Sequence, residues 1–118
     1  MDMNTVFNNL ISNSIDAFHN LKTIRDRKIS ITFSLVKGNI QIVYADNGTG
    51  IPNVFKKNKD EIFLPFTTSK KDRDGNDIGT GLGMYLVKNV VTDNNGTVEL
   101  MDTTVGFKLK IELPIRNK

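Results

Sequence analysis

Three polar side chains near the start of the chain have the types and the spacing for ligand chemistry. In the stretch NNLISNSIDA, residues 8–17, Asn9, Asn13 and Asp16 follow one another at intervals of about one helical turn, so they share one face of a predicted helix. Asn and Asp are mediocre helix formers, so helix propensity does not explain them. The amide of Asn13 offers a hard oxygen of the kind that Mg²⁺ accepts. The apolar residues between them are expected to face a core: Leu10, Ile11 and Ile15.

Two glycine clusters, DNGTGI at residues 46–51 and GTGLGM at residues 79–84, are candidate ligand loops. The chain has no G-x-x-x-x-G-K-[ST], and GTGLGM has its third glycine one position too early for G-x-G-x-x-G,. Each cluster alone is more often a turn than a ligand loop. GTGLGM opens a predicted helix, however, where free N–H groups and the helix dipole favour anions. Asp46 ends a predicted strand, where its carboxylate can accept a hydrogen bond from an exocyclic amine.

The composition is that of one ordinary globular domain. The chain has 118 residues, of which 38% are apolar and 25% charged, and its net charge is +3,. It has no cysteine, which excludes disulfides and thiolate metal sites, and its one histidine cannot make a zinc site by itself,. No apolar run approaches the ~20 residues of a membrane span. Acidic residues lie within or directly beside the small basic groups, which favours a solvated mixed-charge surface over a nucleic-acid face.

Hydrophobic periodicity predicts the elements that must position these residues. Residues 3–22 read as a helix,. RKISITFSLV and IQIVYADN alternate around the turn KGN and predict an antiparallel hairpin. One face of its first strand carries Ile29, Ile31, Phe33 and Leu35, and the matching face of its second carries Ile40, Ile42 and Tyr44. Regular periodicity fades from residue 47 to residue 80, and a loop this long is usually functional or mobile.

A second helix is predicted near residues 82–92, followed by two closing strands, GTVELMD and GFKLKIELP. The residues that share a face of this helix are Leu82, Tyr85, Leu86, Asn89 and Val90. The order of elements predicts an α+β fold: a two-layer α/β sandwich with a mostly antiparallel sheet covered by helices on one face.

Four motifs in this order resemble the ATP-binding domain of the GHKL superfamily, which includes the DNA gyrase B subunit, the ninety-kilodalton heat-shock chaperone, mismatch-repair ATPases and sensor histidine kinases. NNLISNSIDA resembles the N box, DNGTGI the first glycine box, IFLPFTTSK the F box and GTGLGM the second glycine box. The closing GFKLKIELP resembles the last strand of that fold, although the frequent Gly-Thr of the family reads Gly106-Phe107 here. The resemblance covers nearly the whole chain and implies a Bergerat-type ATP-binding fold.

The resemblance implies roles for residues that match its motifs. Asn13 would bind Mg²⁺, Asn9 would face the triphosphate and would be catalytic together with Asn13, and Asp46 would bind the adenine amino group. The ATP-binding residues that it implies are Asn9, Asn13, Asp16, Asp46, Gly48, Gly50, Ile51, Phe66, Lys70, Gly79, Thr80, Gly81, Leu82, Gly83 and Met84. Two assignments in the F box stay open. Phe63 and Phe66 either pack under a lid or touch the ligand, and Lys70 either reaches the phosphates or belongs to a mobile lid.

Asn9 discriminates between the branches of the superfamily. Gyrase and the chaperone carry a glutamate at this spacing, four residues before the Mg-binding asparagine, whereas histidine kinases typically carry asparagine. An amide cannot act as a general base, so the resemblance favours the catalytic ATP-binding domain of a sensor histidine kinase. The alternatives are a GHKL ATPase or an anti-sigma-like protein serine kinase, and a non-catalytic nucleotide-sensing module.

The expected cofactors are ATP and Mg²⁺. The expected partners are the histidine-bearing dimerisation domain of a parent kinase and a downstream response regulator, with no nucleic acid and no direct membrane contact. The chain is expected to be one cytoplasmic domain over residues 1–118, whose parent could be membrane-anchored. Met3 already lies within the N-box helix, which predicts a C-terminal fragment of a longer chain.

Overall fold

The computed structural model describes residues 3–19, 26–50, 59–64 and 83–115. The described elements are two helices, α1 (Met3–His19) and α2 (Gly83–Asp93), a short 3-10 helix, η2 (Lys59–Phe63), and four strands, β1 (Ile29–Val36), β2 (Asn39–Asp46), β3 (Thr97–Leu100) and β4 (Phe107–Pro114). The four strands form one antiparallel sheet in the order β1-β2-β4-β3. The predicted α+β two-layer architecture is therefore confirmed.

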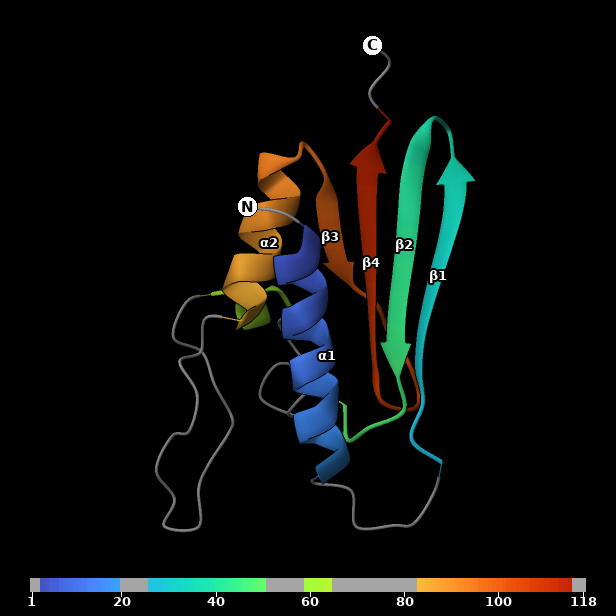
Figure 1. Ribbon diagram of the computed structural model, residues 1–118, viewed down its shortest axis with the longest axis vertical. Helices are drawn as coiled ribbons and strands as arrows, with labels where there is room; N and C mark the ends of the chain where they lie inside the picture. Colours follow the sequence, from blue (N-terminus) through green and yellow to red (C-terminus); the bar gives the residue numbers. More distant parts are fainter. Residues whose placement is uncertain (1–2, 20–25, 51–58, 65–82, 116–118) are drawn as a thin grey trace.

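The two helices form the second layer. Figure 1 shows α1 and α2 side by side on one side of the sheet, with their chains running in opposite directions. The core lies between the layers and holds buried side chains from α1, α2 and three of the four strands: Val6, Leu10, Ile42, Tyr44, Val87, Val90, Val91, Leu100, Leu109 and Ile111. Ile62 and Phe63 of η2 complete it. Phe63 therefore belongs to the core, with the Lys88 ammonium 5.5 Å from its ring centroid,.

The hairpin forms as the alternation predicts. Ile31 pairs with Tyr44 and Phe33 with Ile42, and Lys37 and Gly38 connect the strands with φ angles of 51° and 81°. Positive φ at both residues is the geometry of a two-residue turn whose twist matches the flanking strands.

The apolar row of β1 does not face the core. β1 is an edge strand next to β2, and within the described part of the chain no helix covers it. The residues of this row are exposed: Ile29, Ile31, Phe33 and Leu35.

Two helix faces are also rotated from their predicted orientation. Ile11 and Ile15 are 37% and 47% exposed, because the buried row of α1 runs through Val6, Leu10, Ser14 and Phe18 and the neighbouring positions lie about 100° round the helix,. α2 likewise buries Val87, Val90 and Val91. Tyr85, Leu86 and Asn89 are half-buried beside that stripe. A serine therefore occupies the buried face of α1.

Candidate functional site

A buried cluster of polar side chains joins α1 to the end of β2. Asp46, the last residue of β2, is only 7% exposed, and Ser14 of α1 is 1% exposed. The Ser14 hydroxyl donates a hydrogen bond of 2.6 Å to Asp46 Oδ2, and the Gly48 N–H donates one of 2.9 Å to Asp46 Oδ1. Tyr44 completes the cluster, with its hydroxyl 2.6 Å from Ser14 Oγ. We call these four residues, Ser14, Tyr44, Asp46 and Gly48, the aspartate cluster.

Tyr44 is a fully buried member of this cluster. Its hydroxyl also lies 3.1 Å from the Leu10 carbonyl oxygen, to which it can donate. Burial raises the pKa of the Tyr44 phenol above its ordinary value; the hydrogen bond with Ser14 lowers that pKa, and the nearby Asp46 charge raises it,. The phenol is therefore a neutral donor at physiological pH.

The turn after β2 approaches α1 too closely for a side chain. A Cβ on Gly48 would lie 2.8 Å from the Cβ of Ala17, closer than two carbon atoms can pack. Asn47, between the two cluster members, ties this turn to the start of β1, since its Oδ1 accepts a hydrogen bond of 2.8 Å from the Lys28 N–H. The DNG sequence thus holds the carboxylate, anchors the turn and lets it approach the helix.

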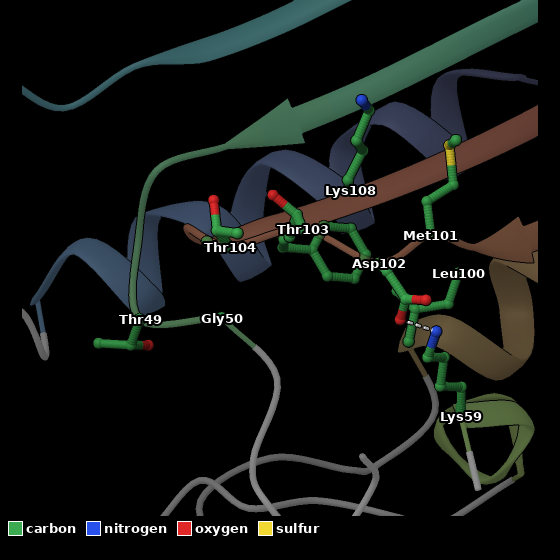
Figure 2. Close-up of a pocket in the computed structure, with 11 residues that line it drawn as sticks. Thr49, Gly50, Lys59, Leu100, Met101, Asp102, Thr103, Thr104 and Lys108 are labelled. Carbon is green, nitrogen blue, oxygen red and sulfur yellow. Dashed lines mark hydrogen bonds and ion pairs between the residues drawn. The ribbon is translucent and has the colours of Figure 1, made fainter. Parts of the chain in front are cut away.

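A pocket of about 280 Å³ lies on the other side of this turn, between Thr49, Gly50 and the connection from β3 to β4. Figure 2 shows its lining, with Lys59 and Asp102 forming an ion pair at one side. Gly106 lies against the end of β2, where a Cβ on it would be 2.0 Å from the Asp46 carbonyl oxygen. Gly50 is a predicted nucleotide-binding residue, whereas none of the threonines or lysines that line the pocket was predicted to bind a ligand.

The start of α2 approaches α1 at Asn9 and Asn13, next to the aspartate cluster. A Cβ on Gly83 would lie 3.3 Å from Asn9 Oδ1 and 4.0 Å from Asn13 Nδ2. Asn9 is oriented by its own helix, because its Nδ2 donates a hydrogen bond of 2.8 Å to the Thr5 carbonyl, which directs Oδ1 toward α2. We call Asn9, Asn13 and Gly83 the amide cluster.

The two clusters lie along one helix and use consecutive residues of it. Asn13 faces the N-terminal end of α2, whereas Ser14 faces β2. Helix N-termini carry unpaired N–H groups and a positive dipole end, so the amide cluster suits an anion. The aspartate cluster offers hydrogen-bond acceptors. Together they suit a ligand with a polyanionic end and an amine at the other.

The remaining predicted site residues divide into two groups. Asp16 lies half-buried on α1, and Met84 lies half-buried at the start of α2, packed against the core. The others lie outside the described residues: Ile51, Phe66, Lys70, Gly79, Thr80, Gly81 and Leu82. Sequence reasoning overlooked Ser14 and Tyr44. The signals were available, since Ser14 is four residues after Leu10 and Tyr44 shares a strand face with Asp46.

Comparison with known proteins identifies the fold and its family. Residues 1–117 match the family described as histidine kinase-, DNA gyrase B- and HSP90-like ATPases. The chain belongs to this family. It is 32% identical over 105 residues to the C4-dicarboxylate transport sensor protein DctB of Rhizobium meliloti, covering 89% of this chain and 15% of that protein. It is 29% identical over 114 residues to the sensor histidine kinase CpxA of Escherichia coli K12, covering 96% of this chain and 23% of CpxA.

The fold agrees with a solved kinase domain. A nucleotide-free structure of the catalytic domain of the histidine kinase ThkA superposes with a TM-score of 0.70 at 26% identity, covering 96% of this chain and 69% of that one. The match is to an ATP-binding catalytic domain of the sensor histidine kinase type. The chain spans less than a quarter of the length of DctB and CpxA. No helix in the described ranges is long and apolar enough to cross a membrane.

Proposed function

We propose that this chain is the Mg-ATP-binding catalytic domain of a cytoplasmic two-component kinase module. In this proposal it donates the γ-phosphoryl group of ATP to a histidine on a separate dimerisation domain of the same parent kinase. A response regulator would then take the phosphoryl group from that histidine. The observation that carries the proposal is the amide of Asn9, which is held facing the N-terminal end of α2.

The two clusters support the two ends of an ATP molecule. The aspartate cluster supplies an acceptor for the adenine amino group, and the amide cluster supplies N–H groups and amide side chains for the triphosphate. When bound, ATP supplies the phosphoryl group and Mg²⁺ supplies positive charge beside it. The predicted ATP-binding residues that lie outside the described ranges would add further contacts: Ile51, Phe66, Lys70, Gly79, Thr80, Gly81 and Leu82.

The side chains present fit a magnesium ion bound largely through phosphate. Mg²⁺ in nucleotide sites typically keeps several waters and takes only one or two oxygens from the protein. Asn13 can supply one such oxygen beside the start of α2. No group of three or more acidic, His or Cys side chains that could hold a metal exists among the residues that the structure describes, which fits a metal that arrives with the nucleotide.

Asn9 favours transfer to histidine over hydrolysis. Phosphoryl transfer depends mainly on positioning and charge stabilisation, and the acceptor is the nucleophile that is oriented and activated. The Asn9 amide can accept a hydrogen bond but has no protonation change near neutral pH, so it cannot take a proton from water. Asn9 therefore does not activate water next to the triphosphate, which leaves the γ-phosphoryl group available to a docked histidine.

The test measures two products from one purified protein. The 118-residue chain is incubated with radiolabelled Mg-ATP, with and without the parent dimerisation domain, and both phosphate release and label on the partner are followed. We expect label on the partner's histidine and negligible phosphate release. Asn13→Ala should abolish labelling, while Asn8→Ala, which removes an exposed amide from the same helix, should not. Brisk phosphate release that requires Asn13, with no label on the partner, would instead make the chain a hydrolase.

A further inference from the structure

Two residues with no predicted role, Ser14 within the stretch NNLISNSIDA and Tyr44 in β2, form a chain of hydrogen bonds to the carboxylate that ends β2. We infer that Ser14 and Tyr44 are positioning residues that set nucleobase selectivity, by holding the Asp46 carboxylate in one orientation through a chain of hydrogen bonds. This inference rests on the proposed function, in which Asp46 binds the adenine amino group. It adds two residues that do not touch the base and act only through Asp46.

Counting hydroxyl protons fixes the direction of the chain. Ser14 Oγ is 2.6 Å from both Asp46 Oδ2 and the Tyr44 hydroxyl. A serine hydroxyl has one proton, and an ionised carboxylate can only accept. The Ser14 proton is therefore committed to Asp46, so Ser14 can only accept from Tyr44. The relay runs from Tyr44 to Ser14 to Asp46.

Tyr44 also removes a competing partner for Ser14. A serine inside a helix can turn its hydroxyl back to the carbonyl four residues earlier, which here is that of Leu10. The Tyr44 hydroxyl lies 3.1 Å from that carbonyl and can share its proton with it,. With Tyr44 present, Ser14 is supplied with a donor on one side and keeps the carboxylate as its acceptor. Without it, Leu10 and Asp46 would compete for the serine proton.

The result is a carboxylate fixed at both oxygens. Ser14 holds Oδ2 from the helix, and the Gly48 N–H holds Oδ1 from the turn. Each carboxylate oxygen has more than one lone-pair direction, so one donor on each leaves capacity for an amine. Because Asp46 is 7% exposed, a rotation of its side chain would change which part of the carboxylate a ligand can reach. Fixing the rotamer before binding favours a base with an amine at the matching place.

The experiment compares two nucleotides that differ in one group. Binding of Mg-ATP and of Mg-purine-riboside triphosphate, which lacks the 6-amino group, is measured by calorimetry on the 118-residue chain. The ratio of the two Kd values reports how strongly the amine is recognised. A charge-assisted hydrogen bond predicts a ratio of roughly 10 to 100 in the wild type. Asp46→Ala should bring it near one.

Tyr44→Phe and Ser14→Ala test the relay separately. The first keeps the ring, which meets Phe107 edge to face at a centroid distance of 6.3 Å. Loss of one supporting hydrogen bond predicts that each variant lowers the ratio by roughly 2- to 10-fold. The whole change should appear in the Kd of ATP, with the purine analogue unaffected. Ser12→Ala, at an exposed position of α1, is the matched control.

The outcomes separate the two proposals. If Asp46→Ala collapses the ratio but Tyr44→Phe and Ser14→Ala leave it unchanged, the relay is wrong and adenine recognition stands. If both variants weaken the two nucleotides equally, their role is only structural and the relay is again wrong. A wild-type ratio near one would overturn adenine reading by Asp46 itself.

Discussion

The aspartate cluster and the amide cluster use neighbouring residues of the same helix, yet they are held in different ways. Both oxygens of the Asp46 side chain accept hydrogen bonds, from Ser14 and Gly48, and the cluster is almost fully buried. In the amide cluster Asn9 is half-buried, and its side chain is oriented by a hydrogen bond that its Nδ2 donates to the Thr5 carbonyl of the same helix. The aspartate cluster thus holds its carboxylate in one orientation, whereas the amide cluster presents hydrogen-bond donors and amide oxygens at a partly exposed surface.

This difference matches what each end would recognise in the proposed function. A base is identified by where its donors and acceptors lie, so its receptor gains from being fixed in advance. A triphosphate with Mg²⁺ brings its own charge and its own coordination shell, so the protein needs only a positive helix end and a suitable oxygen. Selectivity should therefore depend on the aspartate cluster, and phosphoryl transfer on the amide cluster.

The largest effect is expected at Asn13. Asn13→Ala removes the side-chain oxygen that we assign to Mg²⁺, and losses of 10- to 100-fold are typical even for residues that only support a metal ligand. We expect phosphoryl transfer to fall by about 100-fold or more, with the ratio of ATP to purine-analogue affinity unchanged. Transfer rates at several Mg²⁺ concentrations, together with calorimetry, measure both quantities. A changed ratio would show that the two clusters do not act separately.

A pair of glycine substitutions compares the packing of the two clusters. A methyl group at Gly48 would lie 2.8 Å from the Ala17 Cβ, which cannot rotate away, whereas one at Gly83 would lie 3.3 Å from the end of the flexible Asn9 side chain. Gly48→Ala should lower the free energy of unfolding by about 1–3 kcal/mol. Gly83→Ala should change it by no more than about 0.5 kcal/mol.

Urea denaturation of both variants measures this contrast. A double variant, Ala17→Gly with Gly48→Ala, should be more stable than the sum of the single effects, because it removes the methyl group that clashes. Equal destabilisation by Gly48→Ala and Gly83→Ala would contradict the difference in packing.

Most of the fold followed from sequence because its patterns are local. The alternation from Ile29 to Asp46 predicted the hairpin and its pairing, and the motif order predicted the α+β fold. Alternation shows only which residues share a face, however. Phe33 and Ile111 both pair with Ile42, on opposite sides of it, but Phe33 is 62% exposed and Ile111 fully buried. Their positions in the sheet, relative to the helices, decide burial.

The site was predictable in part for a related reason. The residues of the motifs, such as Asn9, Asn13 and Asp46, are polar where the neighbouring pattern is apolar, so they can be recognised in a sequence. Ser14 and Tyr44 fit the apolar pattern instead, one as a small helix residue and the other as an aromatic strand residue. The role that we infer for them depends on a contact between residues 30 positions apart. Only the packing of α1 on β2 brings their hydroxyl groups together.

The smallest expected effect concerns pH and the neutral phenol of Tyr44. Burial is the main cause that raises the pKa of Tyr44 in the folded protein above its ordinary 10.0. The Ser14 hydrogen bond lowers this pKa, and the Asp46 charge raises it further. Above pH 10.0 the unfolded chain therefore loses this proton while the folded protein keeps it. Because the folded state then binds more protons, the free energy of unfolding falls as pH rises toward the folded-state pKa.

Tyr44→Phe removes this ionisation and leaves the lysines unchanged, so their titration cancels in the comparison. We expect the free energy of unfolding of the wild type, minus that of Tyr44→Phe, to be constant from about pH 7 to 9. Above pH 10.0 this difference should fall, so that the wild type becomes less stable relative to the variant,. Urea denaturation across this range measures it. A difference that stays flat or grows with pH would mean that Tyr44 ionises as easily in the folded protein as in the unfolded chain, or more easily. In that case Tyr44 would not be the buried neutral donor that the relay to Asp46 requires.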